Sequence, residues 1–199
     1  MRNRFGLGVV GAALAITSFA VVTSAQAPAA PAAPAAQSVA VANPTYTTIV
    51  METTVNRPAA EVWKRVGKYC DIGEWFQGLN CTITAGKDGE VGAVRSVANE
   101  VLVGKTELSY TYTQPVREGR PYNLYHGTLE ARPVTATTSR LIYTLVYDNS
   151  MLADDAARER DRAQRTQQFT TALANMKILA EGGTLPPAPA RGGGRGRGN

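Results

Sequence analysis

The chain has 199 residues, a formal net charge of +5 and 19% charged residues. All 16 acidic residues lie between positions 44 and 182, and the excess positive charge comes from Arg2, Arg4, Arg191, Arg195 and Arg197. The middle of the chain is therefore neutral, which argues against a nucleic-acid-binding domain, because such domains present a basic face to phosphates. One histidine and two cysteines are too few for the usual structural zinc site, so we expect no metal.

Residues 1–25 have the layout of a secretory signal peptide, with a basic start, an apolar run and small residues before an expected cleavage after Ala25. An uncleaved membrane anchor is the alternative, because the apolar run reaches the lower edge of a bilayer-spanning length. Its glycines spell G-x-G-x-x-G but lack the βαβ context of a dinucleotide site, and we expect no cofactor. We predict export to the periplasm or outside the cell, without stable membrane insertion after cleavage.

The remainder divides into three parts by composition. Residues 26–43 are rich in Ala and Pro and indicate an extended linker. Residues 44–182 have the size of one ordinary domain, which we expect to be monomeric. Residues 183–199 are rich in Gly, Arg and Pro and are predicted to be a disordered tail. One function hypothesis, a cell-envelope interaction protein, would use the linker and the tail as its working parts.

The domain begins with a predicted strand and two short helices. Residues 46–55 are rich in β-branched side chains, which is typical of a strand. Pro58 then marks a helix start, and apolar residues recur at helical spacing over residues 59–66. Residues 71–76 predict a second short helix or a turn.

A long β region and a long helix follow. Turn signals separate six further short strands, which predicts an antiparallel meander. These strands are expected at residues 81–85, 93–98, 101–105, 108–113, 122–132 and 140–148. Residues 154–181 predict a helix with an apolar stripe that includes Phe169, Leu173 and Met176. The predicted fold is α+β, a curved antiparallel sheet of about seven strands wrapped around a long C-terminal helix, with two short helices after the first strand.

Strand alternation places a row of tyrosines on the inward face of the sheet. The row comprises Tyr110, Tyr112, Tyr125, Tyr143 and Tyr147. A tyrosine in an apolar interior must pair its hydroxyl group or meet solvent. The row therefore predicts an apolar hollow with polar groups, lined also by Trp75, Phe169, Leu173 and Met176. The alternative interpretation is ordinary core packing.

Three polar residues are weighed as further site residues. Arg95 and Glu100 flank a strand turn and are candidates for an ion pair at the cavity mouth, although surface pairs of this kind are far commoner. His126 is the single histidine, and its strand parity points it outward. Catalysis through His126 is therefore not expected.

Cys70 and Cys81 bracket the second short helix. In an oxidising compartment they are candidates for a disulfide, which would attach this helix to the strand that follows. Two buried thiols are an equally good interpretation, because the geometry decides between them.

Four segments resemble the START-like superfamily, and in particular the polyketide cyclase/dehydrase and lipid-transport family (SRPBCC). They are Pro58–Trp63, Trp75–Cys81, Gly92–Arg95 and Asn123–Leu129. The resemblance implies a helix-grip fold with a hydrophobic cavity between the sheet and the long helix. It favours a protein that holds a small hydrophobic or amphipathic ligand, namely a lipid-like, sterol-like or aromatic molecule, and the signal-like N-terminus adds export to this prediction. The alternative is a cyclase or dehydratase that uses cavity tyrosines.

Overall fold

The computed structural model describes residues 41, 43–117 and 119–187. The predicted signal segment, almost all of the linker and most of the tail lie outside the described residues. The elements follow the chain as β1 (Tyr46–Val55), α1 (Ala59–Val66), α2 (Ile72–Trp75), β2 (Ile83–Ala85), β3 (Val94–Arg95), β4 (Glu100–Lys105), β5 (Ser109–Thr113), β6 (Asn123–Pro133), β7 (Ser139–Asp148) and α3 (Asp155–Ala180).

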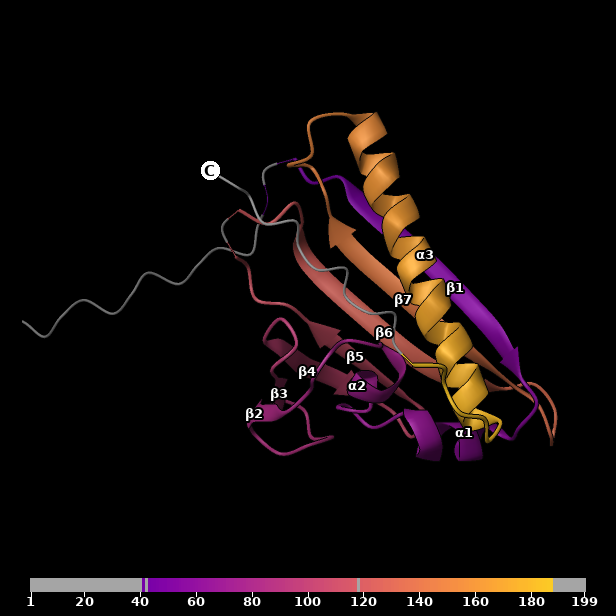
Figure 1. Ribbon diagram of the computed structural model, residues 1–199. Coiled ribbons are helices and arrows are strands. Elements are labelled where there is room, and N and C mark those ends of the chain that lie inside the picture. The colour runs from indigo at the N-terminus through magenta and orange to yellow at the C-terminus, as the bar shows by residue number, and fades with distance from the viewer. Residues whose placement is uncertain (1–40, 42, 118, 188–199) are drawn as a thin grey trace, which may run out of the picture. The chain divides into compact units, whose positions relative to one another are not determined.

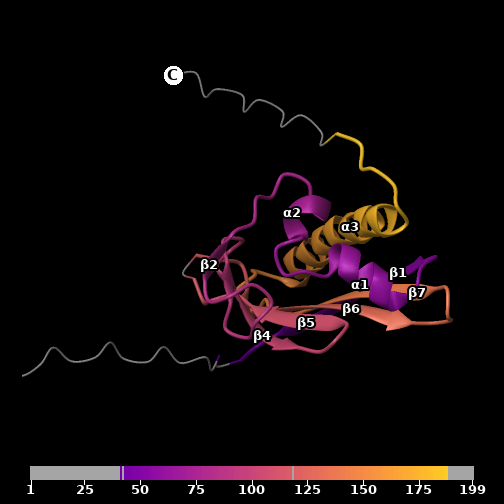
Figure 2. The same ribbon diagram turned by 90° about the horizontal axis from the view of Figure 1, so that it is seen from below.

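The strands form one antiparallel sheet in the order β1-β7-β6-β5-β4-β3-β2. In Figure 2, α1, α2 and α3 all lie on the same face of this sheet. Register shifts between Leu102 and Gly104 and between Asn123 and His126 interrupt the ladders, and such bulges bend a sheet. The predicted fold class, a curved seven-stranded sheet around a long terminal helix, is confirmed. β3 is shorter than expected because Ala98 and Asn99 take positive φ angles of 52° and 54° and turn the chain into β4.

The long helix α3 crosses the sheet over β1 and β7 (Figure 1). The Asp154 carboxylate caps its first turn by accepting a hydrogen bond from the Ala157 N–H at 2.7 Å. At the other end, the Asn56 N–H donates to the Glu181 carboxylate at 2.8 Å. The Lys177 ammonium donates to the Thr54 carbonyl at 2.6 Å. The cap stabilises the first turn of α3, and the contacts at its last turn attach that end of the helix to the end of β1.

Candidate functional site

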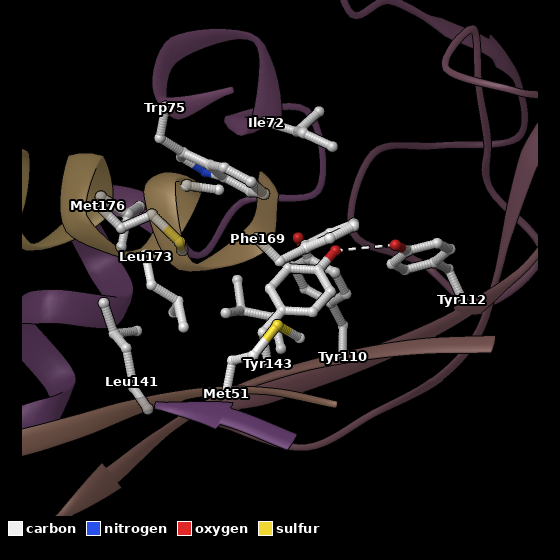
Figure 3. Close-up of a cluster of buried hydrophobic side chains, with 14 of the residues drawn as sticks. Met51, Ile72, Trp75, Tyr110, Tyr112, Leu141, Tyr143, Phe169, Leu173 and Met176 are labelled. Carbon is white, nitrogen blue, oxygen red and sulfur yellow. Dashed lines mark hydrogen bonds between the residues drawn. The ribbon is translucent and has the colours of Figure 1, made fainter. Parts of the chain in front are cut away.

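The structure brings together the side chains that the sequence predicts as the ligand-lining set. The tyrosine row comes from β5, β6 and β7, the Phe169, Leu173 and Met176 side chains come from α3, and Trp75 comes from α2. All are at least nine-tenths buried, and Trp75, Tyr143 and Met176 have no exposed surface. In Figure 3 the Trp75 indole points into the space between α3 and the sheet.

These side chains fill the space in which the sequence predicts an open hollow. The ring centroids of Tyr143 and Phe169 are 4.6 Å apart, and those of Trp75 and Tyr143 are 6.3 Å apart. An open hollow lined by these side chains would expose much of their surface, but each of them is at most 7% exposed. The expectation of a hollow at these residues is therefore corrected: α2 turns Trp75 inward, and the large aromatic rings occupy the volume themselves.

Gly127 explains how the tyrosine row becomes a packed layer. It lies opposite Tyr112 in the β5–β6 register, and a Cβ at this position would be 2.4 Å from the Tyr112 hydroxyl. The Tyr112 ring therefore lies directly over β6 and reaches β7, where its hydroxyl hydrogen-bonds the Tyr143 hydroxyl at 2.8 Å. Burial raises the pKa of both phenols well above the usual value, so both stay neutral.

Arg165 of α3 covers the end of the tyrosine row at Tyr147. The Arg165 guanidinium of α3 lies 4.6 Å from the ring centroids of both Tyr122 and Tyr147. It pairs with Asp161 at 3.0 Å, and the same carboxylate accepts the Tyr147 hydroxyl at 2.8 Å. The Tyr147 hydroxyl and the Arg165 guanidinium are thus both paired with the Asp161 carboxylate.

Arg95 and Glu100 pair as predicted, but they do so inside the protein and not at a mouth. The two residues face each other across β3 and β4, and Arg95 Nε donates to Glu100 Oε2 at 2.6 Å. Arg95 has no exposed surface and Glu100 is 3% exposed. The Arg95 guanidinium lies 4.3 Å from the Tyr69 ring centroid and 4.6 Å from that of Tyr112. The mouth position is corrected because the segment carrying Tyr69 covers the pair.

The surroundings of this pair determine its charge. Burial raises the pKa of the Glu100 carboxyl, and the Arg95 guanidinium and the Gln114 amide oppose that rise by stabilising the carboxylate. The Gln114 amide donates to Glu100 Oε1 at 2.8 Å, and Arg95 Nη1 donates to the Tyr69 carbonyl at 2.5 Å. The hydroxyls of Tyr69 and Tyr110 and the indole N–H of Trp75 are also buried, and the described residues offer them no hydrogen-bond partner.

An open pocket of about 520 Å³ lies on the other side of Tyr110, between the end of α1 and the β4–β5 hairpin. Its apolar lining residues are Trp63, Tyr69, Leu102 and Tyr110, of which Trp63 is partly exposed and the other three are buried. The rest of the lining consists of Lys64, Gly67, Lys68, Asp88, Gly89, Lys105, Thr106, Glu107 and Ser109. Of the ligand-lining residues predicted from the sequence, only Tyr110 belongs to this lining.

Trp63 is the pocket residue that sequence reasoning missed, because its place on the apolar helical face indicates a core residue. The indole lies against Gly67, where a Cβ would be 2.3 Å from the ring. Its ring centroid is 5.7 Å from that of Tyr110. Trp63 is only partly buried, so one part of the ring packs on the protein while another part faces the pocket. A glycine four residues after a helical tryptophan is the signal that would have indicated this placement.

The sequence leaves open whether Cys70 and Cys81 form a disulfide or stay as two thiols, and the structure answers this. Cys70 and Cys81 are joined, with their Cα atoms 5.4 Å apart. The loop that they close contains α2 and Trp75. The bond therefore holds the two ends of the segment that places Trp75 in the interior.

His126 lies on the exposed face of β6, and its Nδ1 is 2.9 Å from the Leu124 carbonyl oxygen. Across the described ranges no three His, Cys, Asp or Glu side chains gather as a metal site. No helix of the described part is long and apolar enough to span a membrane. Among the described residues, the groups that the pocket exposes are the partly buried Trp63 indole and the charged side chains of its rim.

A curved antiparallel sheet around a terminal helix, with two short helices on the same face, defines the helix-grip class of START-like ligand-binding folds. The chain belongs to the polyketide cyclase / dehydrase and lipid transport family, whose profile matches residues 46–181. The resemblance inferred from the sequence is thereby confirmed. No curated protein matches the chain at a significant level.

Solved structures agree with this fold. A protein from Thermobifida fusca, solved by NMR in solution, is 24% identical, with 71% of this chain and 99% of that chain covered and a TM-score of 0.58. The Zhui aromatase/cyclase from Streptomyces sp. R1128 is 18% identical, with 70% and 100% covered and a TM-score of 0.53. Truncated norcoclaurine synthase from Thalictrum flavum is 14% identical, with 70% and 96% covered and a TM-score of 0.53. Similarity at this level shows the fold alone.

Proposed function

We propose that the chain is a binding protein for a small apolar or amphipathic molecule, which occupies the pocket between α1 and the β4–β5 hairpin. The observation that carries the proposal is the open volume of about 520 Å³, which lies within the usual range of small-molecule sites. The family supports a ligand-binding role, and the filled interior favours this pocket over the space beneath α3.

The wall of the pocket favours a ligand with a flat, apolar body. The partly exposed Trp63 indole packs against the buried Tyr110 ring, with the ring centroids 5.7 Å apart, and Leu102 also belongs to the lining. A planar ring system gains both apolar burial and ring contacts against such a wall. Aromatic, sterol-like and lipid-like molecules meet this requirement, and we rank aromatic ligands first.

The chemistry of the pocket favours binding over turnover. Burial raises the pKa values of Tyr69 and Tyr110, so their phenols are neutral hydrogen-bond donors and poor bases. None of the lining residues is a histidine. A general acid–base reaction needs a group whose pKa lies near the working pH, and these phenols do not supply one.

Export remains part of the proposal. Its support is the signal-like sequence of residues 1–25 and the Cys70–Cys81 disulfide, because disulfides persist mainly in oxidising compartments. Mass spectrometry of the protein recovered from the periplasm and the culture medium tests it. We expect a mature chain that begins after Ala25, and recovery of the full-length chain in the membrane fraction would favour an uncleaved anchor.

The ligand site is tested with a neutral aromatic probe, N-phenyl-1-naphthylamine, whose fluorescence rises in apolar surroundings. We expect the full chain to bind it, and we expect Trp63→Ala to weaken binding roughly tenfold through loss of an aromatic wall. Tyr46→Ala is the matched control, since Tyr46 is 58% exposed and does not line this pocket. No binding to the probe, or equal binding by Trp63→Ala that stays folded by circular dichroism, contradicts the proposal.

A further inference from the structure

The rim of the pocket is charged, and its two sides differ in net charge. Lys64 and Lys68 lie on the side of α1, and the Asp88 and Glu107 carboxylates lie on the side of the β2–β3 loop and the β4–β5 hairpin. Lys105 is also a hairpin residue. A ligand in this pocket therefore meets positive charge on the helix side and mixed charge on the hairpin side.

The internal interactions of the three ammonium groups differ. The Lys105 ammonium already donates to the Gly89 carbonyl at 2.6 Å across the pocket. No hydrogen bond or ion pair engages the side chain of Lys64 within the described residues. Among the residues that the structure describes, the Lys68 ammonium interacts only at longer range, with Asp71, whose carboxylate accepts from the Lys68 backbone N–H at 3.0 Å. The helix side thus presents two ammonium groups that a ligand can engage.

Arg65, the other positive residue at the end of α1, is not free to bind a ligand in the same way. Arg65 donates to the Glu74 carboxylate at 2.6 Å, so its charge is paired on another side of the helix. The buried phenols of Tyr69 and Tyr110, which line the pocket, lack hydrogen-bond acceptors among the described residues. Both hydroxyls are buried, so the groups that the open pocket presents to a ligand on this side are the Lys64 and Lys68 ammonium groups.

We infer that the ligand of this pocket carries an anionic group, a carboxylate, sulfonate or phosphate, on an aromatic body, with the anionic group between Lys64 and Lys68. This inference rests on the proposed function. The aromatic body lies against Trp63 and Tyr110, and the anionic group lies at the end of α1. The acidic side of the rim repels the same group and so orients the ligand.

Two probes with the same ring systems test the inference. The neutral one is N-phenyl-1-naphthylamine, and 1-anilinonaphthalene-8-sulfonate adds one sulfonate. We expect the purified full chain to bind the sulfonate more tightly at low salt. The double variant Lys64→Gln/Lys68→Gln should weaken sulfonate binding about threefold to tenfold, as expected for two partly exposed charges. Its binding of the neutral probe should change much less than its binding of the sulfonate, because the neutral probe makes no ion pair with the two lysines.

A variant of opposite sign provides the matched control. Asp88→Asn/Glu107→Gln should strengthen sulfonate binding by a similar factor and change neutral-probe binding much less. Added salt should reduce the preference for the sulfonate, because exposed charges are screened. Equal affinity for the two probes, or equal loss of both in the lysine variant, overturns the inference and leaves the proposed function standing. Binding of neither probe overturns the proposed function, and the inference falls with it.

Discussion

The two tryptophans of this chain lie on neighbouring short helices, yet they differ in solvent exposure. Trp75 is fully buried between α2, α3 and the sheet, whereas Trp63 is partly exposed at the pocket beside α1. Both contact tyrosines of the same sheet. The difference in exposure comes from the elements that cover each ring. α3 and the disulfide-closed α2 segment enclose Trp75, whereas no described element encloses the outer edge of Trp63. Aromatic content therefore predicts where a site can be, while covering elements decide whether it stays open.

Replacing each tryptophan gives the largest contrast in stability. Trp75→Ala should lower the free energy of unfolding by about 4 kcal/mol, because it removes a large core side chain and leaves a cavity. Trp63→Ala should cost about 1–2 kcal/mol, since part of the ring already faces solvent. Urea denaturation measures both. Equal losses in the two variants would break the comparison.

The buried ion pair should give the next largest effect. Glu100→Gln should destabilise the protein by about 3 kcal/mol, because the Arg95 charge is left buried without its counter-charge. The double variant Arg95→Met/Glu100→Leu is the control and should recover most of this loss. A Glu100→Gln protein as stable as the original would show that the pair is reached by solvent, as a mouth position would require.

The disulfide should have a smaller effect that sharpens the contrast. Cys70→Ala/Cys81→Ala should lower stability by about 2 kcal/mol, as expected for closing a short loop. Because the loop contains Trp75 and not Trp63, hydrogen exchange should accelerate around α2 and stay unchanged around α1. Acceleration at both places would show that the two regions are not independent.

Alkaline pH should lower the free energy of unfolding gradually, through the buried tyrosines of the interior. Burial holds the pKa values of Tyr112 and Tyr143 above those of the unfolded chain. Their contribution to stability is therefore complete below about pH 10 and is lost as the pH rises above it, at about 1 kcal/mol per buried tyrosine for each pH unit. Urea denaturation at rising pH measures this. The folded tyrosines should ionise only as the protein unfolds, and phenolate absorbance that appears before unfolding would contradict the account.

Particular residues show which features of the fold and the site could be predicted from the sequence. Strand alternation correctly predicted the inward row from Tyr110 to Tyr147, because side-chain direction follows a period of two. The pairing of Arg95 with Glu100 was also predictable across a turn. Their depth was not, because it depends on the distant segment at Tyr69. The open pocket was missed for the same reason, since it forms between α1 and a hairpin that are far apart along the chain.

The most direct test follows the two indole N–H signals of Trp63 and Trp75 in ¹⁵N–¹H spectra, assigned with Trp63→Phe and Trp75→Phe. During titration with N-phenyl-1-naphthylamine, the Trp63 signal should shift in proportion to occupancy while the Trp75 signal stays in place. A shift of the Trp75 signal with the Trp63 signal unchanged would place the ligand under α3 and contradict the assignment of the site.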